Sequence, residues 1–182
     1  MPKTTYVIVS TLNGYVAAAD GGLDWLVALD GGDRDISAHV AAAGVIAMGA
    51  TTYEDVIATE SLLDDPEIWR RAHGDRPAWV FTHRELPRIP GANLTFASDV
   101  RAAHGDMTRA AGDGDILIAG GGGLAAAFAE AGLLDEIVVG IAPVALAAGR
   151  PLFPADLPAS RLRLSDVDRR GQLVFLTYRV DQ

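Results

Sequence analysis

The chain has 182 residues, a length typical of one domain, and its 49% hydrophobic content suffices for a buried core. Its 24 acidic and 15 basic side chains give a net charge of −9, which disfavours nucleic acid or an anionic membrane as a partner, because phosphates are neutralised by basic patches. There is no cysteine, which excludes disulfides, thiol catalysis and thiolate metal sites. The only lysine is Lys3, so a catalytic or phosphate-binding lysine in the body of the chain is excluded as well.

No segment has the pattern of a targeting or membrane sequence. The first apolar run, residues 6–9, is too short for the core of a signal peptide. The uncharged stretches 116–129 and 137–149 fall below the roughly 18 residues that a membrane-spanning helix needs. We therefore expect a cytoplasmic protein that does not bind membranes.

The first third of the chain predicts two strands and two helices. An apolar β-rich strand over 5–10 is followed by a long irregular connection over 11–32, which carries turn residues and Trp25. Asp33 can cap a helix whose apolar residues Ile36, Val40 and Ala43 follow helical spacing. A short strand over 45–48 then runs into Gly49 and a helix that starts near Thr51 and Thr52.

The remainder alternates in the same way. Residues 58–76 are polar and predict a surface excursion. Strands are expected over 78–81, 93–97, 115–119 and 136–141, with a helix capped by Ser98 and another after the glycines at 120–123. The apolar face of the Ser98 helix would hold Val100, Ala103, Met107 and Ala110. In the tail, a hairpin turn at 169–172 precedes a strand that places on one face Val174, Leu176, Tyr178 and Val180.

This order predicts an α/β fold in one domain over residues 1–182. Strands that alternate with helices favour a central sheet of mainly parallel strands with flanking helices. The last two strands are joined too closely to be parallel, so the sheet is mixed and ends in a C-terminal antiparallel hairpin.

The glycine run at 120–123 lies between a strand and a helix. Backbone N–H groups at such a junction can bind a phosphate, and glycine lets the anion approach closely. The alternative is a tight packing turn, a common use of clustered glycines. A dinucleotide fold of the Rossmann type is disfavoured, because Asp135 and Glu136 precede the next strand instead of ending it.

Two other predicted strands also end in polar or glycine residues. Residues 49–52 combine a glycine with two hydroxyls at a helix start, and residues 82–84 are Thr82, His83 and Arg84. Each has a simpler explanation, helix capping for the first and a solvated loop for the second. Ligands of open α/β sheets gather at the carboxyl ends of strands, so three such ends together favour a ligand site.

Candidate residues for proton transfer are few. Asp35 and His39 lie four apart on the predicted helix and could act as an acid–base pair, although a solvated helix face is the simpler explanation. The four histidines match no metal-binding spacing, and no Gly-x-Ser-x-Gly motif indicates a serine hydrolase. Trp25 can belong to the core or contact a ligand.

Several motifs occur in an order that resembles a known family. They are Ser10–Val16 (STLNGYV), Leu23–Leu26 (LDWL), Met48–Glu54 (MGATTYE), Gly120–Leu124 (GGGGL), Ala131–Glu136 (AGLLDE), Ala142–Val144 (APV) and Gly149–Phe153 (GRPLF). Together they cover most of the chain. They resemble the stand-alone proteins related to the carboxy-terminal reductase domain of the bifunctional riboflavin-biosynthesis deaminase/reductase, RibD. That family shares the dihydrofolate reductase fold.

The resemblance implies a three-layer fold with about eight strands, NADPH as cofactor and, commonly, a homodimer. It implies hydride transfer to a small pyrimidine-like or pterin-like heterocycle, with the helix after Asp33 lining the substrate cavity and Trp25 on the substrate side. The loop that carries Asn13 would border the nicotinamide. The other residues implied to bind the cofactor are Gly49, Thr51, Thr52, Thr82, His83, Arg84, Gly120, Gly121, Gly122, Gly123 and Leu124.

Three residues depart from the family pattern. Ala50 stands where a basic residue is common, which weakens the expected recognition of the 2′-phosphate. Asn13 stands where aspartate is usual, and Ala147 where a glycine is expected. The alternative hypothesis is a catalytically idle nucleotide-binding dimer that has retained the fold.

Overall fold

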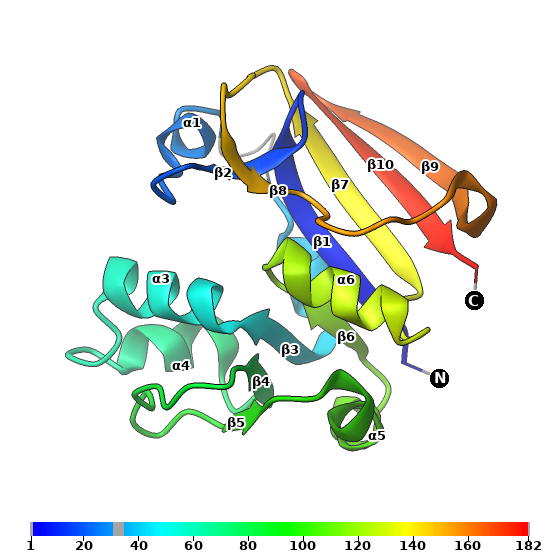
Figure 1. Cartoon of the computed structure of the whole chain (residues 1–182). Coiled ribbons are helices and arrows are strands. Elements are labelled where there is room, and N and C mark those ends of the chain that lie inside the picture. The colour runs from blue at the N-terminus through cyan, green and yellow to red at the C-terminus, as the bar shows by residue number, and fades with distance from the viewer. Residues whose placement is uncertain (1, 31–34, 182) are drawn as a thin grey trace.

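The computed structural model describes residues 2–30 and 35–181, which form a central sheet with helices on both of its faces (Figure 1). The sheet has eight strands in the order β5-β4-β3-β6-β1-β7-β10-β9. These strands are β1 (Thr4–Thr11), β3 (Ala43–Gly49), β4 (Ala78–Phe81), β5 (Leu94–Ala97), β6 (Asp115–Ile118), β7 (Glu136–Ala142), β9 (Leu162–Arg170) and β10 (Leu173–Val180). A separate antiparallel pair consists of β2 (Tyr15–Ala18) and β8 (Gly149–Pro151).

The helices are α1 (Asp24–Val27), α2 (Ser37–Ala42), α3 (Ala50–Glu60), α4 (Glu67–His73), α5 (Val100–Ala111) and α6 (Gly122–Glu130), with a 3₁₀ turn at Ala159–Arg161. None of the helices in the described ranges is long and apolar enough to span a bilayer.

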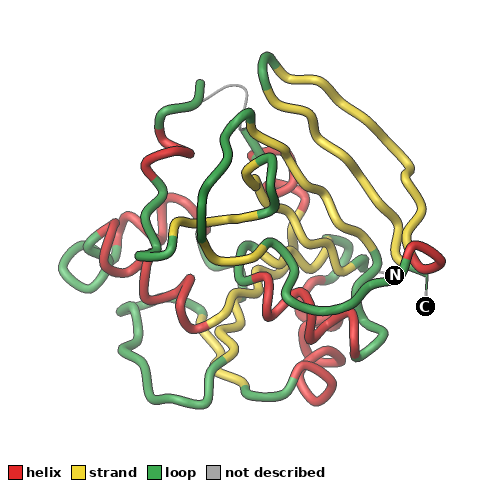
Figure 2. Tube along the Cα trace, turned by 45° about the horizontal axis from the view of Figure 1, so that its top comes forward, coloured by secondary structure: helices red, strands yellow, loops and turns green. Residues whose placement is uncertain are grey.

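The sheet is mixed and mainly parallel, as the sequence predicts. All pairs from β5 across to β7 are parallel, whereas β10 runs antiparallel to both β7 and β9. Figure 2 shows the β9–β10 hairpin as the long pair of strands at one edge. The parallel strands therefore share one carboxyl edge, where the segments after β1, β3, β4, β5 and β6 emerge together.

Alternating side chains of each central strand supply two apolar layers. In β3, Val45 and Ala47 pack with residues of α5 and α6 on one face of the sheet. Ile46 and Met48 face the other way and pack with Tyr53 of α3 and other buried side chains. Helices α1 and α2 add partly buried apolar side chains to a third cluster that contains alternate residues of β1. The result is a three-layer arrangement in which the sheet is covered by helices on both faces.

Two segments hold more structure than their sequence predicts. The stretch 11–32, expected to be irregular, contains β2 and α1, and the polar stretch 58–76 contains the end of α3 and all of α4. Leu62 and Trp69, each 2% exposed, bury this second segment against the sheet. Trp69 and Ile68, with Leu62 ahead of the helix, dock a short helix whose remaining residues are mostly charged.

The cap of α5 and the face of the last strand also differ from prediction. The carboxylate of Asp99, not Ser98, accepts hydrogen bonds from the N–H groups of Arg101 and Ala102. In β10 the deeply buried side chains are Leu173 and Phe175, which point away from the predicted face, together with Val180. The predicted cap of the earlier helix, Asp33, lies outside the described residues, and α2 begins at Ser37.

The cap of α5 generates a test of local stability. Replacing Asp99 by alanine leaves two first-turn N–H groups without their acceptor, and we expect the free energy of unfolding to fall by about 1 kcal/mol. Ser98→Ala is the matched control and should change stability much less. Urea denaturation of the two variants measures the difference, and an equal loss in both would contradict the assignment of the cap to Asp99.

Candidate active site

A cleft of about 230 Å³ opens at the carboxyl edge of the sheet. It brings together segments that follow three neighbouring strands and the first turns of α6. The residues that line it are Gly49, Phe81, Thr82, His83, Ser98, Val100, Gly123, Leu124 and Ala127. A second depression of about 450 Å³ shares Ser98, Val100 and Ala127 with it and extends toward Arg101 and Glu130. The two therefore form one elongated groove along α6.

The cleft lies where the helices that follow β3 and β6 diverge to opposite faces of the sheet. These two strands are neighbours, yet α3 packs on one face and α6 on the other. Their N-terminal ends consequently meet at the edge, as Figure 1 shows. A Cβ added to Gly121 would lie 3.7 Å from the backbone nitrogen of Gly49. Such a divergence point is where open α/β sheets bind ligands.

Both of these helix ends lack a side-chain cap. The N-cap positions of α3 and α6 are Gly49 and Gly121, and neither helix has a hydrogen bond from a capping side chain. The positive end of each helix dipole and its first-turn N–H groups can therefore serve an anion instead of a side chain of the protein. Two such ends side by side are suited to a ligand with two adjacent negative groups.

The glycines of this junction fall into two kinds. A Cβ on Gly49 or on Gly123 would meet no other atom within 4 Å, so both face open space. A Cβ on Gly120 would lie 2.9 Å from the methyl group of Thr52, and one on Gly122 would lie 2.4 Å from the carbonyl oxygen of Leu152. The run thus combines both interpretations that its sequence leaves open. Gly120 and Gly122 make close packing contacts, whereas Gly123 and the separate Gly49 leave room beside the N–H groups.

The segment after β4 folds back on itself beside the cleft. The hydroxyl of Thr82 accepts a hydrogen bond from the N–H of Arg84 at 2.9 Å and donates one to its carbonyl at 3.1 Å. His83, between them, lines the cleft. The guanidinium of Arg84 turns toward α3 and binds both carboxylate oxygens of Glu54, at 3.0 and 2.7 Å. These charge-assisted bonds raise the pKa of Arg84 above its usual value.

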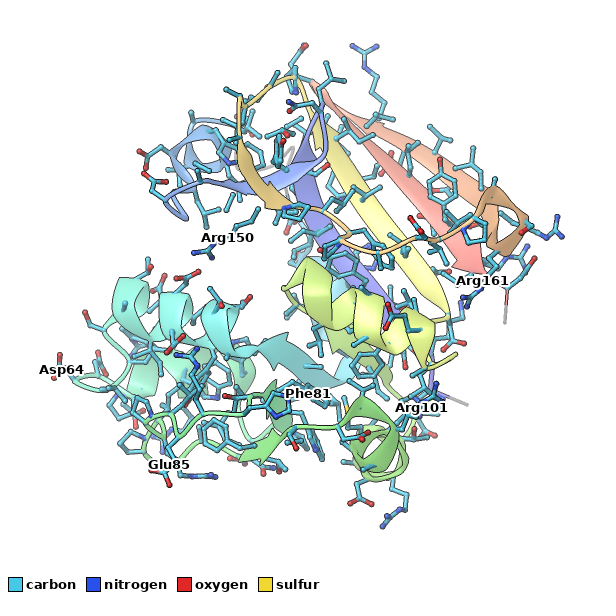
Figure 3. All side chains as sticks on the ribbon, in the orientation of Figure 1. Asp64, Phe81, Glu85, Arg101, Arg150 and Arg161 are labelled. Atoms are coloured by element: carbon cyan, nitrogen blue, oxygen red, sulfur yellow. The ribbon has the colours of Figure 1, made fainter. Side chains whose placement is uncertain are left out.

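A second arginine contacts the same helix from the other side. Arg150 of β8 donates a hydrogen bond to Asp55 at 2.9 Å, and Figure 3 shows its side chain extending from β8 toward α3. Its guanidinium also occupies the space beside Gly21, where an added Cβ would lie 2.5 Å from one nitrogen. The two consecutive carboxylates of α3 thus each bind an arginine from a different part of the chain.

Asn13 links two loops above the end of β1. Its side-chain oxygen accepts hydrogen bonds from the hydroxyl of Thr11 and the N–H of Leu146, and its amide nitrogen donates to the carbonyl of Leu146 at 2.7 Å. Neighbouring backbone bonds join Leu12 to Val144 and Gly14 to Leu152. The side chain is thereby committed to holding the loops together, and the predicted contact between Asn13 and the cofactor stays a prediction.

The predicted acid–base pair, Asp35 and His39, does not lie on one helix, because only His39 belongs to α2. Asp35 precedes α2, and its carboxylate accepts hydrogen bonds from the N–H and the hydroxyl of Ser37. These bonds, with a smaller contribution from Arg170, lower the pKa of Asp35. His39 lies within α2 and is half-buried. Among the described contacts no hydrogen bond joins the two side chains.

Trp25 packs against the same apolar cluster as Val40 of α2, the helix that the family resemblance predicts to line the substrate cavity. Its ring packs in the third apolar cluster, beside residues of β1 and with Ile36 and Val40 of the α2 segment. Its indole nitrogen is buried and makes no hydrogen bond within the described protein. Buried indole N–H groups are usually hydrogen-bonded, and within the described ranges the same lack of a partner is found at the indole nitrogen of Trp69.

Comparison with known proteins identifies the family. Residues 56–176 match the family described as the RibD C-terminal domain. The chain belongs to the RibD C-terminal domain family. An uncharacterized Bacillus subtilis protein, YwjB, is 29% identical to this RibD C-terminal-like protein over 177 residues, 97% of each chain.

Solved structures agree with the fold. A putative riboflavin biosynthesis protein from Shewanella sp. PV-4 is 22% identical, with a TM-score of 0.76 over 99% of both chains. A diaminohydroxyphosphoribosylaminopyrimidine deaminase/5-amino-6-(5-phosphoribosylamino)uracil reductase from Thermotoga maritima is 17% identical, with a TM-score of 0.70 over 98% of this chain and 56% of that one. Dihydrofolate reductase from Enterococcus faecalis, solved with NADP(H), is 14% identical, with a TM-score of 0.64 over 99% of this chain and 97% of that one. The fold is therefore that of dihydrofolate reductase.

The structure brings together only part of the predicted set. Five of the residues expected to bind the cofactor line the cleft: Gly49, Thr82, His83, Gly123 and Leu124. Phe81, Ser98, Val100 and Ala127 also line it and are not in the predicted set. The sequence could have predicted Ser98 as a cleft residue, because its hydroxyl directly follows a strand, as that of Thr82 does. Thr51 and Thr52 lie in the first turn of α3, and the second of these packs against Gly120.

The role of Asn13 in joining the loops can be measured directly. In Asn13→Ala the N–H of Leu146 loses its acceptor, so we expect its amide hydrogen to exchange with solvent at least about fivefold faster, the equivalent of roughly 1 kcal/mol of local stability. Hydrogen exchange followed by mass spectrometry on the segment 143–148 tests this. Unchanged exchange there would show that the backbone bonds alone hold the loops.

Proposed function

We propose that this RibD C-terminal-like protein is an NADPH-dependent reductase that transfers a hydride to a small pyrimidine-like or pterin-like heterocycle. The observation that carries the proposal is the meeting of two uncapped helix N-termini, at Gly49 and Gly121, beside a cleft lined by open glycine positions. This arrangement fits the pyrophosphate of a dinucleotide, which needs closely spaced N–H donors and room for its backbone approach. The family and the fold neighbours, which are reductases, support the same reaction class.

The residues of the chain would divide the binding of the cofactor among three regions. The first turns of α3 and α6 would hold the phosphates, with Thr51 and Thr52 adding hydroxyls. The turn formed by Thr82, His83 and Arg84 would contact the adenosine ribose and its 2′-phosphate. The loop that Asn13 anchors would border the nicotinamide. When bound, the nicotinamide supplies the hydride, and the protein fixes its orientation against the substrate.

The substrate would lie under α1 and α2. Trp25 has a buried N–H with no acceptor among residues 2–30 and 35–181, and such a donor would suit a carbonyl or ring nitrogen of a heterocycle. Reduction also consumes a proton. The lowered pKa of Asp35 keeps that carboxyl ionised near neutral pH, so it holds no proton to give. We therefore assign the proton to His39, because histidine commonly serves as a general acid, with Asp35, four residues before it in the sequence, as a supporting negative charge.

The cleft glycines provide the sharpest test of cofactor binding. Gly123 has no left-handed backbone angle and open space at its Cβ, so valine fits the free protein but projects into the cleft. We expect Gly123→Val to weaken NADPH roughly 5- to 150-fold, which corresponds to an overpacking cost of about 1–3 kcal/mol. Calorimetric titration measures the affinity.

A matched control exists for this variant. Gly105 lies on an exposed part of α5, and its added Cβ also meets nothing within 4 Å. Gly105→Val should therefore preserve NADPH affinity. Gly121→Val is a poorer test, because its φ of +91° strains any side chain whether or not a ligand binds. Unaltered affinity in a folded Gly123→Val protein would refute the phosphate site.

Turnover distinguishes a reductase from an idle nucleotide-binding dimer. NADPH oxidation should be followed with a panel of pterins and pyrimidines, and on a substrate so found His39→Gln should lose about 10²- to 10⁴-fold in kcat. Asp35→Asn should lose less, because the residue would only support the charge on its neighbour. Full turnover in the His39 variant would exclude it as the proton donor, and the binding of NADPH without turnover on any substrate would favour the idle alternative.

A further inference from the structure

The most specific charged contact beside the cleft joins Arg84 to Glu54. Two guanidinium nitrogens face two carboxylate oxygens at 3.0 and 2.7 Å, a bidentate geometry. The side chains are 59% and 39% exposed, so both remain within reach of a ligand. Exposed pairs of this kind contribute little to the stability of the folded protein. The same two charges can change the affinity for a charged ligand beside them by more than they change the stability of the fold.

The backbone that carries Arg84 is fixed, whereas its guanidinium can exchange partners. The hydroxyl of Thr82 bonds to both the N–H and the carbonyl of Arg84, which fixes the turn. The preceding residue, His83, lines the cleft. Arg84 is thus held next to the cleft, but its side chain turns from there toward the carboxylate on the second turn of α3.

The described arginine nearest to Arg84 in sequence, Arg88, is already engaged, because it donates to the carbonyl of Leu94 and lies over the ring of Phe96. Lys3, the only lysine, lies at the start of β1, at the opposite edge of the sheet, and pairs with Glu136. Arg101, at the far end of the groove, donates to the carbonyls of Glu130 and Ala131. Arg150 is bound to Asp55. Arg84 is therefore the best-placed cation for a phosphate at the adenosine end, and Glu54 already neutralises it.

We propose that Glu54 competes with the 2′-phosphate of NADPH for Arg84 and so sets the preference between NADPH and NADH. This inference rests on the proposed function. A phosphate monoester carries about −1.5 to −2 charges near pH 7 and uses the same guanidinium fork as a carboxylate. NADPH must displace Glu54 or stand beside it as a like charge. NADH has a hydroxyl at that position and meets no such conflict.

The test is the affinity of Glu54→Gln for the two cofactors. Glutamine keeps the size of the side chain and removes its charge. A unit charge about 6 Å from a nearly divalent phosphate in a water-like dielectric corresponds to an effect of about five- to tenfold. We expect NADPH to bind Glu54→Gln about five- to tenfold more tightly than it binds the parent protein, with NADH unchanged. The gain should shrink at high salt, because exposed charges are screened.

Two further variants and one further ligand pair test whether the effect of Glu54 is specific to the 2′-phosphate. Asp55→Asn removes the neighbouring carboxylate, which binds Arg150, and should leave the ratio of the two affinities unchanged. Arg84→Ala should weaken NADPH alone, a change opposite to that of Glu54→Gln. The pair 2′,5′-ADP and 5′-ADP should reproduce the selective gain without a nicotinamide. Thermal unfolding of each variant checks that the fold is kept.

Each other outcome refutes the proposal. Equal changes in NADPH and NADH affinity would mean that Glu54 acts on the general electrostatics of the cleft. Weaker NADPH binding in Glu54→Gln would mean that the carboxylate positions Arg84 for the phosphate instead of competing with it. Failure of the proposed function is distinguishable from both, because the parent protein would then bind neither cofactor.

Discussion

The site depends on one topological constraint: β3 and β6 are adjacent, but the helices that follow them cover opposite faces of the sheet. Both helices must therefore begin at the same edge and separate from there. Glycines at both N-cap positions leave these helix ends without capping side chains, and Gly120 and Gly122 let the chain pass close to Thr52 and to β8. The sheet thus fixes the position of a set of N–H donors before any ligand is present, which lowers the ordering cost of binding.

The charges around this edge explain why backbone groups are so prominent there. The chain carries a net charge of −9, and its only lysine is remote from the cleft. The two arginines that flank α3 are each bound to a carboxylate of that helix, Glu54 or Asp55. Much of the attraction for an anion would therefore come from the helix ends and peptide N–H groups of α3 and α6, which receive no hydrogen bond from a capping side chain.

Sequence patterns identified the strands well, because period and composition are local properties. The central apolar runs, the glycine junctions and the C-terminal hairpin are all where they were expected. The misses come from non-local interactions. Helix α4 is docked mainly by Trp69 in an otherwise polar segment, and β2 pairs with β8 across more than a hundred residues. Ser98 and Asp99 are both good caps, and only the geometry of the turn selects the second.

The same limit applies to the site. The sequence indicates which strand ends gather at the edge, because parallel strands share their direction. It does not indicate which glycine of the run faces open space and which packs, since the direction of each missing Cβ depends on neighbours such as Leu152. Nor does it pair Glu54 with Arg84, thirty residues away on another element.

The contact between Gly122 and β8 has a consequence for how this fold can diverge. Because the carbonyl oxygens of Pro151 and Leu152 fill the space where a side chain at 122 would stand, β8 and the first turn of α6 share one steric boundary. If segment 149–152 were replaced by that of a relative, it would fit only if its backbone followed the same path, or if the relative's residues 120–123 were transferred with it. Gly122 and the segment 149–152 would therefore have to be exchanged together between homologues, although residues 123–148 lie between them in the chain.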